Sequence, residues 1–454
     1  MEDDAFAGVS AITNRSQSNV VERVGANDSP TESAQLSESA QRWNSLVFIV
    51  NNSIGYFVAP VFYVGVLHAA ILSSLNFGDT IANLPESVYM WMMPIPVLIA
   101  WCWPSTRHLR RMLIINYTCK GSAGILAAAL FFMAPQWLAV GLVVHAGVIG
   151  ITNGVANMCL WELIGRGMTP ARRGWTLGIT FGVGPAFAVL GSCASQLILS
   201  GRFLDLIYMT PLPKPWCYVV LFGVTGPAMV VSIACVFLAH LPREGSVEPQ
   251  TSVAGVIQGL KQYFTYRLIL VAVFGFLMTS AGGNMIMNNL ALYVRDKMGE
   301  LPERYTGEQL ALRFGCKSLF GFTLGWMLAR YQAKVPALAT TLICLAGIIW
   351  ALVVPGKWYL LSFGLLGAGE LYYVYYLNYI VACSAPDRIR ENTAYTNLIM
   401  IVVSFMPLAY GGISENYGLR SSFVLALGIL IVAAFVVSTM LPRCPVPNII
   451  DSRK

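Results

Sequence analysis

Two basic residues stand four positions apart in a stretch that is otherwise almost entirely apolar. Arg313 and Lys317 belong to the run EQLALRFGCKSLFGFTLGWMLARY. In an α-helix, residues four apart share a face, where like charges repel each other. A cation at the centre of a membrane-spanning helix costs at least about 3 kcal/mol on insertion scales. The pair therefore predicts a wet cavity, a carboxylate or an anionic ligand on this face rather than lipid.

Glu370 is the carboxylate best placed to pair with these cations. It lies near the middle of the apolar segment 358–383, close to Gly364, Gly367 and Gly369. A carboxylate buried without a cationic partner tends to take up a proton, whereas a neighbouring Lys or Arg keeps it charged. Two interpretations stay open: a structural ion pair of Glu370 with Lys317 or Arg313, and a proton-coupling group that competes with a solute for the same cations.

Further polar side chains recur at helical spacing in other apolar segments. Asn284 and Asn288 are four residues apart, as are Tyr372 and Tyr376, which follow Glu370. Buried amides must be hydrogen-bonded, so each Asn could join two helices or line a polar path, and the Tyr stripe could pack or stack on a solute. The candidate solute-binding residues are therefore Arg313, Lys317, Asn284, Asn288, Tyr372 and Tyr376, with Glu370 as the candidate proton-coupling residue.

The composition indicates a protein that spans a membrane many times. Hydrophobic residues make up 56% of the 454 residues and charged residues 11%, against about 25% charged residues in soluble domains. Several apolar runs reach the length of about 20 residues that crosses a hydrocarbon core. No nucleotide-binding Gly-x-x-x-x-Gly-Lys loop, Cys-x-x-Cys pair or set of paired catalytic acids occurs. We therefore expect no cofactor, no metal and no enzymatic activity.

Twelve apolar segments can be drawn, and a connection with linker composition at 242–266 separates them into two sets of six. The segments cover 46–73, 82–102, 112–133, 138–163, 174–200, 216–240, 267–294, 309–330, 336–354, 358–383, 393–413 and 420–441. The sequence thus predicts an all-α membrane protein with twelve transmembrane helices in two pseudo-symmetric six-helix bundles. We expect a disordered cytosolic tail at 1–44, bundles at 45–241 and 267–442, and a short cytosolic tail at 443–454.

Basic residues in the loops predict the orientation of the chain. If the amino terminus is cytosolic, the tails and cytosolic loops hold 19 Lys and Arg residues and the opposite side holds 7. Both termini are therefore expected in the cytosol, in a plasma (inner) membrane protein. This asymmetry accounts for the net charge of +7, so no nucleic-acid partner is expected.

Basic loops also recur at corresponding places of the two halves. Arg107, Arg110 and Arg111 follow the second segment, and Arg330 and Lys334 follow the eighth. This layout resembles the major facilitator superfamily of secondary transporters, whose helices two and three are joined by a Gly-x-Leu-x-Asp-Arg-x-Gly-Arg-Arg motif. The chain departs from that motif, because Thr106 and Ala329 replace the acids, and Glu162 near the inner end of helix four could substitute for them.

The resemblance implies a monomer with alternating access between two six-helix halves, in which helices 1, 2, 4, 5, 7, 8, 10 and 11 line a central cavity. It also implies transport of a small solute across the bilayer. Arg313 and Lys317 favour a polar or anionic organic solute, and the lack of a nucleotide-binding loop in the sequence favours coupling to protons. A drug or metabolite efflux antiporter is the nearest alternative. A non-transporting membrane sensor or assembly factor on the same scaffold also stays open, because both signature loops lack their acids.

Overall fold

The computed structural model describes residues 36–95, 109–168, 170–240, 259–384, 392, 395–396, 398–443 and 445. Within this part of the chain, helix is present in each of the twelve predicted segments. Residues 1–35, 444 and 446–454 of the predicted tails (1–44 and 443–454) lie outside the described residues. So does most of the predicted linker, although its residues 259–263 are helical.

Within the described residues, the first half of the chain holds nine helices and two short strands. Its helices are α2 (Glu38–Phe57), α3 (Ala59–Phe62), α4 (Val66–Ser74), α5 (Asp79–Met92), α7 (Leu109–Leu130), α8 (Pro135–Gly167), α9 (Pro170–Ser200), α10 (Trp216–Gly223) and α11 (Thr225–Leu238). Between α9 and α10, β1 (Arg202–Phe203) and β2 (Ile207–Tyr208) form a short antiparallel hairpin in the register Arg202 to Tyr208.

The second half repeats the pattern of long helices and short interruptions. Its elements are α13 (Arg267–Thr279), the π-helical turn η2 (Ser280–Asn284), α14 (Met287–Leu292), α15 (Val294–Met298), η3 (Pro302–Tyr305), α16 (Thr306–Tyr331), α17 (Lys334–Val353), η4 (Gly356–Leu360), α18 (Leu361–Gly369), α19 (Tyr372–Cys383), η6 (Met400–Phe405), α21 (Met406–Tyr417) and α22 (Leu419–Met440).

The first helix begins earlier than predicted. The sequence-based boundary left residues up to Asn44 in a disordered tail, but α2 starts at Glu38, and the Ser37 hydroxyl accepts a hydrogen bond from the amide of Ala40. Residues 38–44 are polar, so they give no apolar signal, yet a Ser N-cap followed by an acid is a favourable helix start. Trp43 and Asn44 also bond to carbonyl groups of Leu238 and His240, which fixes this turn on the end of α11.

Several of the predicted membrane segments are interrupted near their middle, three of them at residues close to the candidate site. The first segment changes direction between α3 and α4 around Gly65, the seventh passes through the π-helical turn η2, and the tenth breaks between α18 and α19 at Glu370. Irregular backbone at membrane depth is tolerated where it is buried in protein or lines a cavity. These breaks therefore mark where polar groups are to be sought.

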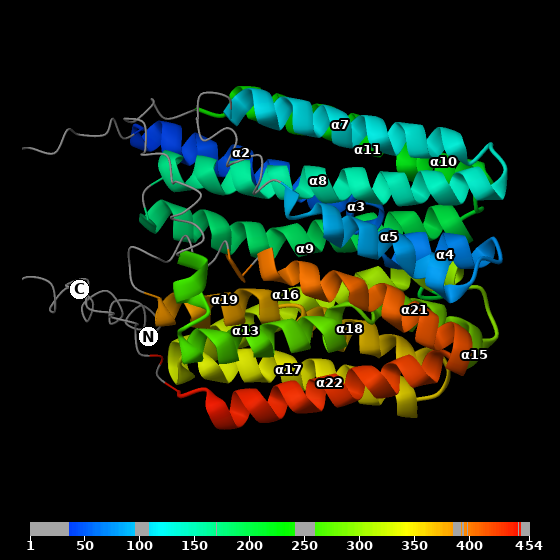
Figure 1. Cartoon of the computed structure of the whole chain (residues 1–454). Helices are drawn as coiled ribbons and strands as arrows, with labels where there is room; N and C mark the ends of the chain where they lie inside the picture. The colour runs from blue at the N-terminus through cyan, green and yellow to red at the C-terminus, as the bar shows by residue number, and fades with distance from the viewer. Residues whose placement is uncertain are drawn as a thin grey trace, which may run out of the picture. The chain divides into compact units, whose positions relative to one another are not determined.

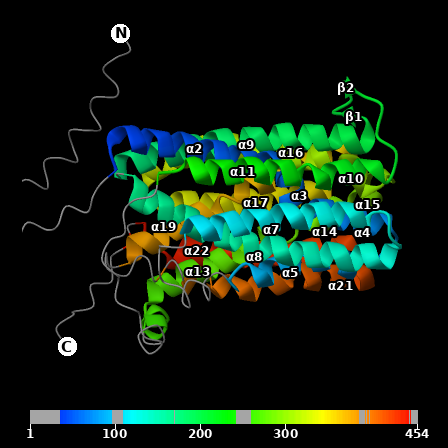
Figure 2. The same ribbon diagram turned by 90° about the horizontal axis from the view of Figure 1, so that it is seen from above.

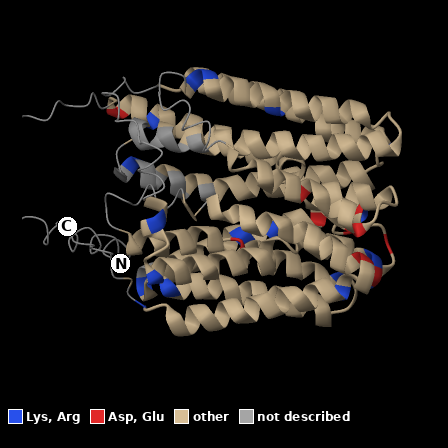
Figure 3. Cartoon of the chain, viewed as in Figure 1, with Lys and Arg blue, Asp and Glu red and all other residues tan. Residues whose placement is uncertain are grey.

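Helices of the two halves pack on one another directly. α9 lies beside α16, and α5 beside α21 (Figure 1 and Figure 2). Among the described residues, seven helical stretches are long and apolar enough to cross a membrane individually. The charged residues gather toward the helix ends, with few in the middle (Figure 3). The remaining predicted segments are interrupted, carry charges or include residues that the structure does not describe. A criterion of helix length and hydropathy therefore does not identify them as membrane spans.

Candidate solute-binding site

Arg313, Lys317 and Glu370 form a buried ionic cluster, which we call the triad. Lys317 Nζ lies 3.0 Å from Glu370 Oε2, and Arg313 Nη2 contacts Glu370 Oε1. The side chains of Arg313 and Glu370 are 10% and 7% exposed, and that of Lys317 is 18% exposed. The carboxylate predicted from the sequence is thus the one that pairs with the two cations of α16.

Glycine residues of α18 permit the close approach that brings Glu370 to Arg313. A Cβ atom on Gly367 would lie 2.2 Å from the carbonyl oxygen of Arg313, and one on Gly364 would lie 2.6 Å from Cys316 Sγ. Backbones can approach this closely only where side chains are missing. Glu370 then caps the carboxyl end of α18, so its side chain leaves the helix at the break rather than from the middle of a continuous helix.

Residues of the first and seventh segments surround the triad. Asn284 Oδ1 accepts a hydrogen bond of 3.5 Å from Arg313 Nη2. The guanidinium carbon of Arg313 lies 5.8 Å from the centre of the Tyr63 ring, which in turn packs edge-on against Phe314 at 5.2 Å. Tyr63 follows α3 in the first half of the chain. The triad therefore lies where the two halves meet, and an aromatic ring of the opposite half faces its arginine.

Glu86 is a second buried carboxylate near the triad, and the sequence analysis did not single it out. It lies on α5, is 6% exposed, and interacts electrostatically with Arg313 and with Glu370. The signal was available, because Glu86 is the acidic residue of the apolar segment predicted over 82–102. It is the same signal that drew attention to Glu370.

Asn288 lies beside Glu86, whereas Tyr372 and Tyr376 turn away from the triad. Asn288 is 1% exposed, and its Oδ1 is 2.7 Å from where a Cβ on Gly65 would lie; the carboxyl carbon of Glu86 is 3.5 Å from that point. Tyr372 donates to Ser280 Oγ at 2.8 Å, and the Tyr376 hydroxyl pairs with that of Thr341 at 2.8 Å. Both tyrosines are buried against α13 and α17.

Lys120 belongs to a buried polar chain in the first half. Lys120 is buried, with 7% of its surface exposed. Its Nζ donates to Asn153 Oδ1 at 2.6 Å, and Asn153 Nδ2 donates to the Tyr89 hydroxyl at 3.0 Å. Its ammonium group also lies 4.3 Å from the centre of the Phe62 ring. Tyr89 is one turn from Glu86 on α5, so this row of hydrogen-bonded side chains ends near the triad.

The basic loop residues have structural contacts at helix ends. Arg110 Nη2 donates to the carbonyl of Ala239 at 2.9 Å, and Lys334 Nζ donates to that of Leu441 at 2.5 Å. Arg111 and Arg330 are exposed. Arg107 and the side chain of Glu162 lie outside the described residues, so the suggested replacement of the motif acid by Glu162 stays a prediction.

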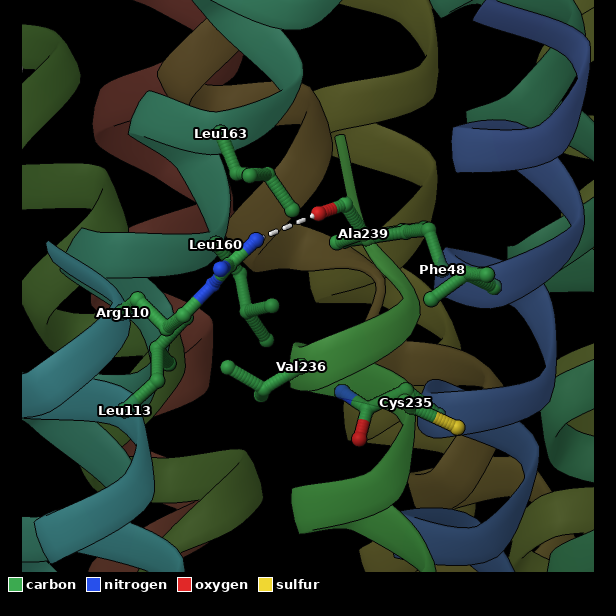
Figure 4. Close-up of a pocket in the computed structure, with 10 residues that line it drawn as sticks. Phe48, Arg110, Leu113, Leu160, Leu163, Cys235, Val236 and Ala239 are labelled. Atoms are coloured by element: carbon green, nitrogen blue, oxygen red, sulfur yellow. Dashed lines mark hydrogen bonds between the residues drawn. The ribbon is translucent and has the colours of Figure 1, made fainter. Parts of the chain in front are cut away.

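Arg110 also lines a small cavity between α2, α7, α8 and α11 (Figure 4). The cavity measures about 20 Å³, and Phe48, Leu160 and Val236 form much of its apolar wall. An organic solute needs a pocket of several hundred Å³. This cavity holds about one water molecule and is separate from the triad.

The two halves are joined by polar contacts at the end of the bundle opposite to the start of α2. Arg295 Nη2 pairs with Asp79 Oδ1 at 2.7 Å, and Asn83 Nδ2 donates to Asn289 Oδ1 at 2.8 Å. Further bonds link the two halves there, among them Lys357 to Asp205, Arg202 to Tyr305, Glu308 to the amide of Leu204, and Glu303 to both Lys214 and Tyr218. These contacts close that end.

No protein-family model matches the sequence, and neither does any curated protein sequence. Solved structures do match. A nucleoside transporter is 13% identical with a TM-score of 0.66, over 88% of this chain and 100% of its own. A bacterial homologue of the human lysosomal transporter Spinster, in an inward-facing conformation, is 14% identical with a TM-score of 0.66, over 88% and 97%. A D-xylose–proton symporter is 14% identical with a TM-score of 0.63, over 89% and 97%.

The chain has the major facilitator superfamily fold. The fold class predicted from the sequence is thereby confirmed. In the major facilitator fold of this chain, the triad lies on the eighth and tenth helices, Asn284 and Asn288 on the seventh, Glu86 on the second and Tyr63 on the first. All five are helices that the resemblance assigned to the cavity.

Proposed function

We propose that this chain is a secondary transporter that moves a small polar or anionic organic solute by alternating access, coupled to protons. The observation that supports the proposal is the imbalance within the triad, where two buried cations face a single carboxylate. Excess positive charge in a poorly solvated place is stabilised by an anion. An anionic group of the solute is the partner that this arrangement favours.

Competition for the same cations would couple the solute to a proton. When Glu370 is ionised, it occupies Arg313 and Lys317. When it takes up a proton, its attraction for both cations falls and they become available to the solute. The solute and the proton would then bind together, which is symport, and the reverse order of events gives release.

The closed end described above fits one state of such a cycle. If both termini are cytosolic, as the basic loops predict, the contacts around Asp79–Arg295 and Asn83–Asn289 seal the external side. Opening that side requires these interactions to break. Several of them are partly exposed, and exposed ion pairs contribute only about 0–1 kcal/mol each, so a solute of modest affinity could drive the change.

Transport into proteoliposomes tests the proposal. Radiolabelled anionic, sugar-like and cationic solutes would be offered with and without an inward proton gradient. We expect the wild-type protein to accumulate an anionic solute in a way that depends on the gradient. Lys317→Ala should lose uptake. Glu370→Gln should still exchange solute across the membrane but should not accumulate it in response to the gradient. Glu38→Gln, an exposed acid of α2, is the matched control.

Three results would contradict parts of this proposal. Coupled uptake that survives Glu370→Gln unchanged removes Glu370 as the coupling residue. Accumulation of cations against an outward proton gradient favours the efflux antiporter. No flux of any solute class through correctly folded protein favours the non-transporting sensor.

A further inference from the structure

Unpaired polar atoms gather on one side of the triad. Glu86 Oε2 and both polar atoms of the Asn288 amide are buried, and in the described part of the chain none of the three makes a well-aligned hydrogen bond, although the Asn288 amide lies near enough to the Glu86 carboxyl to interact with it. The residues themselves are 6% and 1% exposed. Buried polar groups are nearly always hydrogen-bonded, so three such atoms in neighbouring side chains indicate a site for a ligand group that is not part of the protein.

The backbone of the first half comes close to both side chains at Gly65. Gly65 has a φ of 141°, in the region that favours glycine. A Cβ atom there would lie 2.7 Å from Asn288 Oδ1 and 3.5 Å from Glu86 Oε2. A larger residue at position 65 would therefore collide with the Asn288 amide.

The site borders the triad and belongs to both halves. Arg313 interacts electrostatically with Glu86 as well as with Glu370. Glu86 is carried by α5 of the first half and Asn288 by α14 of the second. A solute held by the cations of α16 would therefore extend toward Glu86 and Asn288 and would contact both halves at once.

The chemistry of the unpaired atoms selects a hydroxyl group. Asn288 offers one donor group and one acceptor, and Glu86 offers an acceptor. A hydroxyl both donates and accepts, so it can take a hydrogen bond from Asn288 Nδ2 and give one to Glu86 Oε2. An ammonium group only donates, which would leave Asn288 Nδ2 unpaired and would place a third cation near Arg313.

We propose that Glu86 and Asn288 form a hydrogen-bonding subsite for a hydroxyl of the solute, so that the transported solute is a hydroxylated organic anion. This inference rests on the proposed function, because the triad must hold the anionic group. It narrows the solute class to molecules that carry an acid group and at least one hydroxyl within a few ångströms of it.

Matched pairs of acids test the subsite. The full-length protein in detergent would be heated with lactate or propionate, gluconate or hexanoate, and quinate or cyclohexanecarboxylate, and ligand binding would be read as a rise in Tm. The strongest stabiliser would then be offered in radiolabelled form to proteoliposomes. We expect the hydroxylated member of at least one pair to bind at least about tenfold more tightly than its partner, because an unmet hydrogen bond in a buried site is costly.

Variants separate the subsite from the triad. In Asn288→Leu and Glu86→Gln, the ratio of affinities for the hydroxylated acid and its partner should fall toward one. Binding of the acid without hydroxyls should be retained. In Lys317→Ala, binding of both acids should be lost. Asn416→Leu, an exposed amide of α21, is the control. Gel filtration and the Tm without ligand show whether each variant folds. If Asn288→Leu does not fold, Glu86→Gln still tests the subsite.

The outcomes separate the two proposals. Equal binding of both members of every pair, lost in Lys317→Ala, overturns the hydroxyl subsite and leaves the anion transporter standing. A hydroxyl preference that persists in both subsite variants also overturns the subsite. Binding of none of the six acids contradicts the subsite and the anionic solute together.

Discussion

Arg110 donates a hydrogen bond to the carbonyl oxygen of Ala239, the residue that caps α11, and Lys334 donates to that of Leu441, the residue that caps α22. Each basic residue begins the third helix of its half and binds the end of the sixth. Cations stabilise the carboxyl ends of helices. The two contacts give the basic loops a mechanical role that the repeated sequence pattern did not specify, and they support the division into two related halves.

Removing either contact is expected to loosen its own half. Arg110→Ala and Lys334→Ala should each lower the free energy of unfolding by about 1.5–3 kcal/mol, because a hydrogen bond from a charged donor is lost. Titration of the detergent-solubilised protein with SDS measures the change. Arg111→Ala, at an exposed position, should leave stability within about 0.5 kcal/mol. If it destabilises as much as Arg110→Ala, then general loop charge rather than the cap contact is responsible.

Removing the carboxylate of the triad is expected to be more damaging than removing the whole triad. Glu370→Ala leaves Lys317 buried without its acid partner and leaves Glu86 as the remaining acid near Arg313, so it should destabilise by about 3–5 kcal/mol. The triple variant Arg313→Met, Lys317→Met, Glu370→Gln should unfold near the wild-type SDS concentration, since apolar side chains of similar volume replace the ion pairs. It should also bind no anionic solute. A triple variant as unstable as Glu370→Ala would show that the ion pairs themselves hold the fold.

The buried chain from Lys120 to Tyr89 gives a similar test in the first half. Asn153→Leu should destabilise more than Lys120→Met, because the first change leaves an ammonium group buried beside Phe62 without its acceptor, whereas the second removes the charge and keeps the stem. SDS titration gives the order directly. The opposite order would mean that the ammonium group has another buried partner.

The contact between Asp205 and Lys357 is expected to respond to acid only. Lys357 donates to Asp205 Oδ2 at 2.7 Å and holds the pKa of that carboxyl below its usual range. A depressed pKa in the folded state means that the contact stabilises above the unfolded pKa of about 3.9 and is lost as the pH falls through the folded value. The distance between spin labels at Tyr208 and Trp358, both exposed, should stay constant from pH 8 to 5 and lengthen below about pH 4. Asp205→Asn should lengthen it at every pH.

The sequence predicted the helical segments well because each carries its own apolar signal. It also predicted that Arg313 and Lys317 need an acid partner, since the cost of burying a cation does not depend on the details of packing. Glu370 met that requirement because glycines on α18 let it approach. The start of α2 could not be found this way, because a polar first turn is stabilised by a cap and by contacts with α11 that are far apart in the sequence.

The rest of the site depends on contacts between halves that no local pattern encodes. Tyr63 and Glu86 reach Arg313 only once the first half packs on the second. Tyr372 and Tyr376 follow the charged residue at helical spacing, yet the break at Glu370 turns them toward Ser280 and Thr341. Periodicity predicts which residues share a helix face, but it does not predict where a helix is interrupted.

Gly367 has no functional group, yet the charge balance of the site depends on it. The carbonyl of Arg313 occupies the place where a side chain at this position would begin. Even a methyl group there would push α18 away from α16 and draw the carboxylate of Glu370 back from both cations. A change of one small residue could therefore alter the electrostatics of the triad without replacing any of its charged side chains.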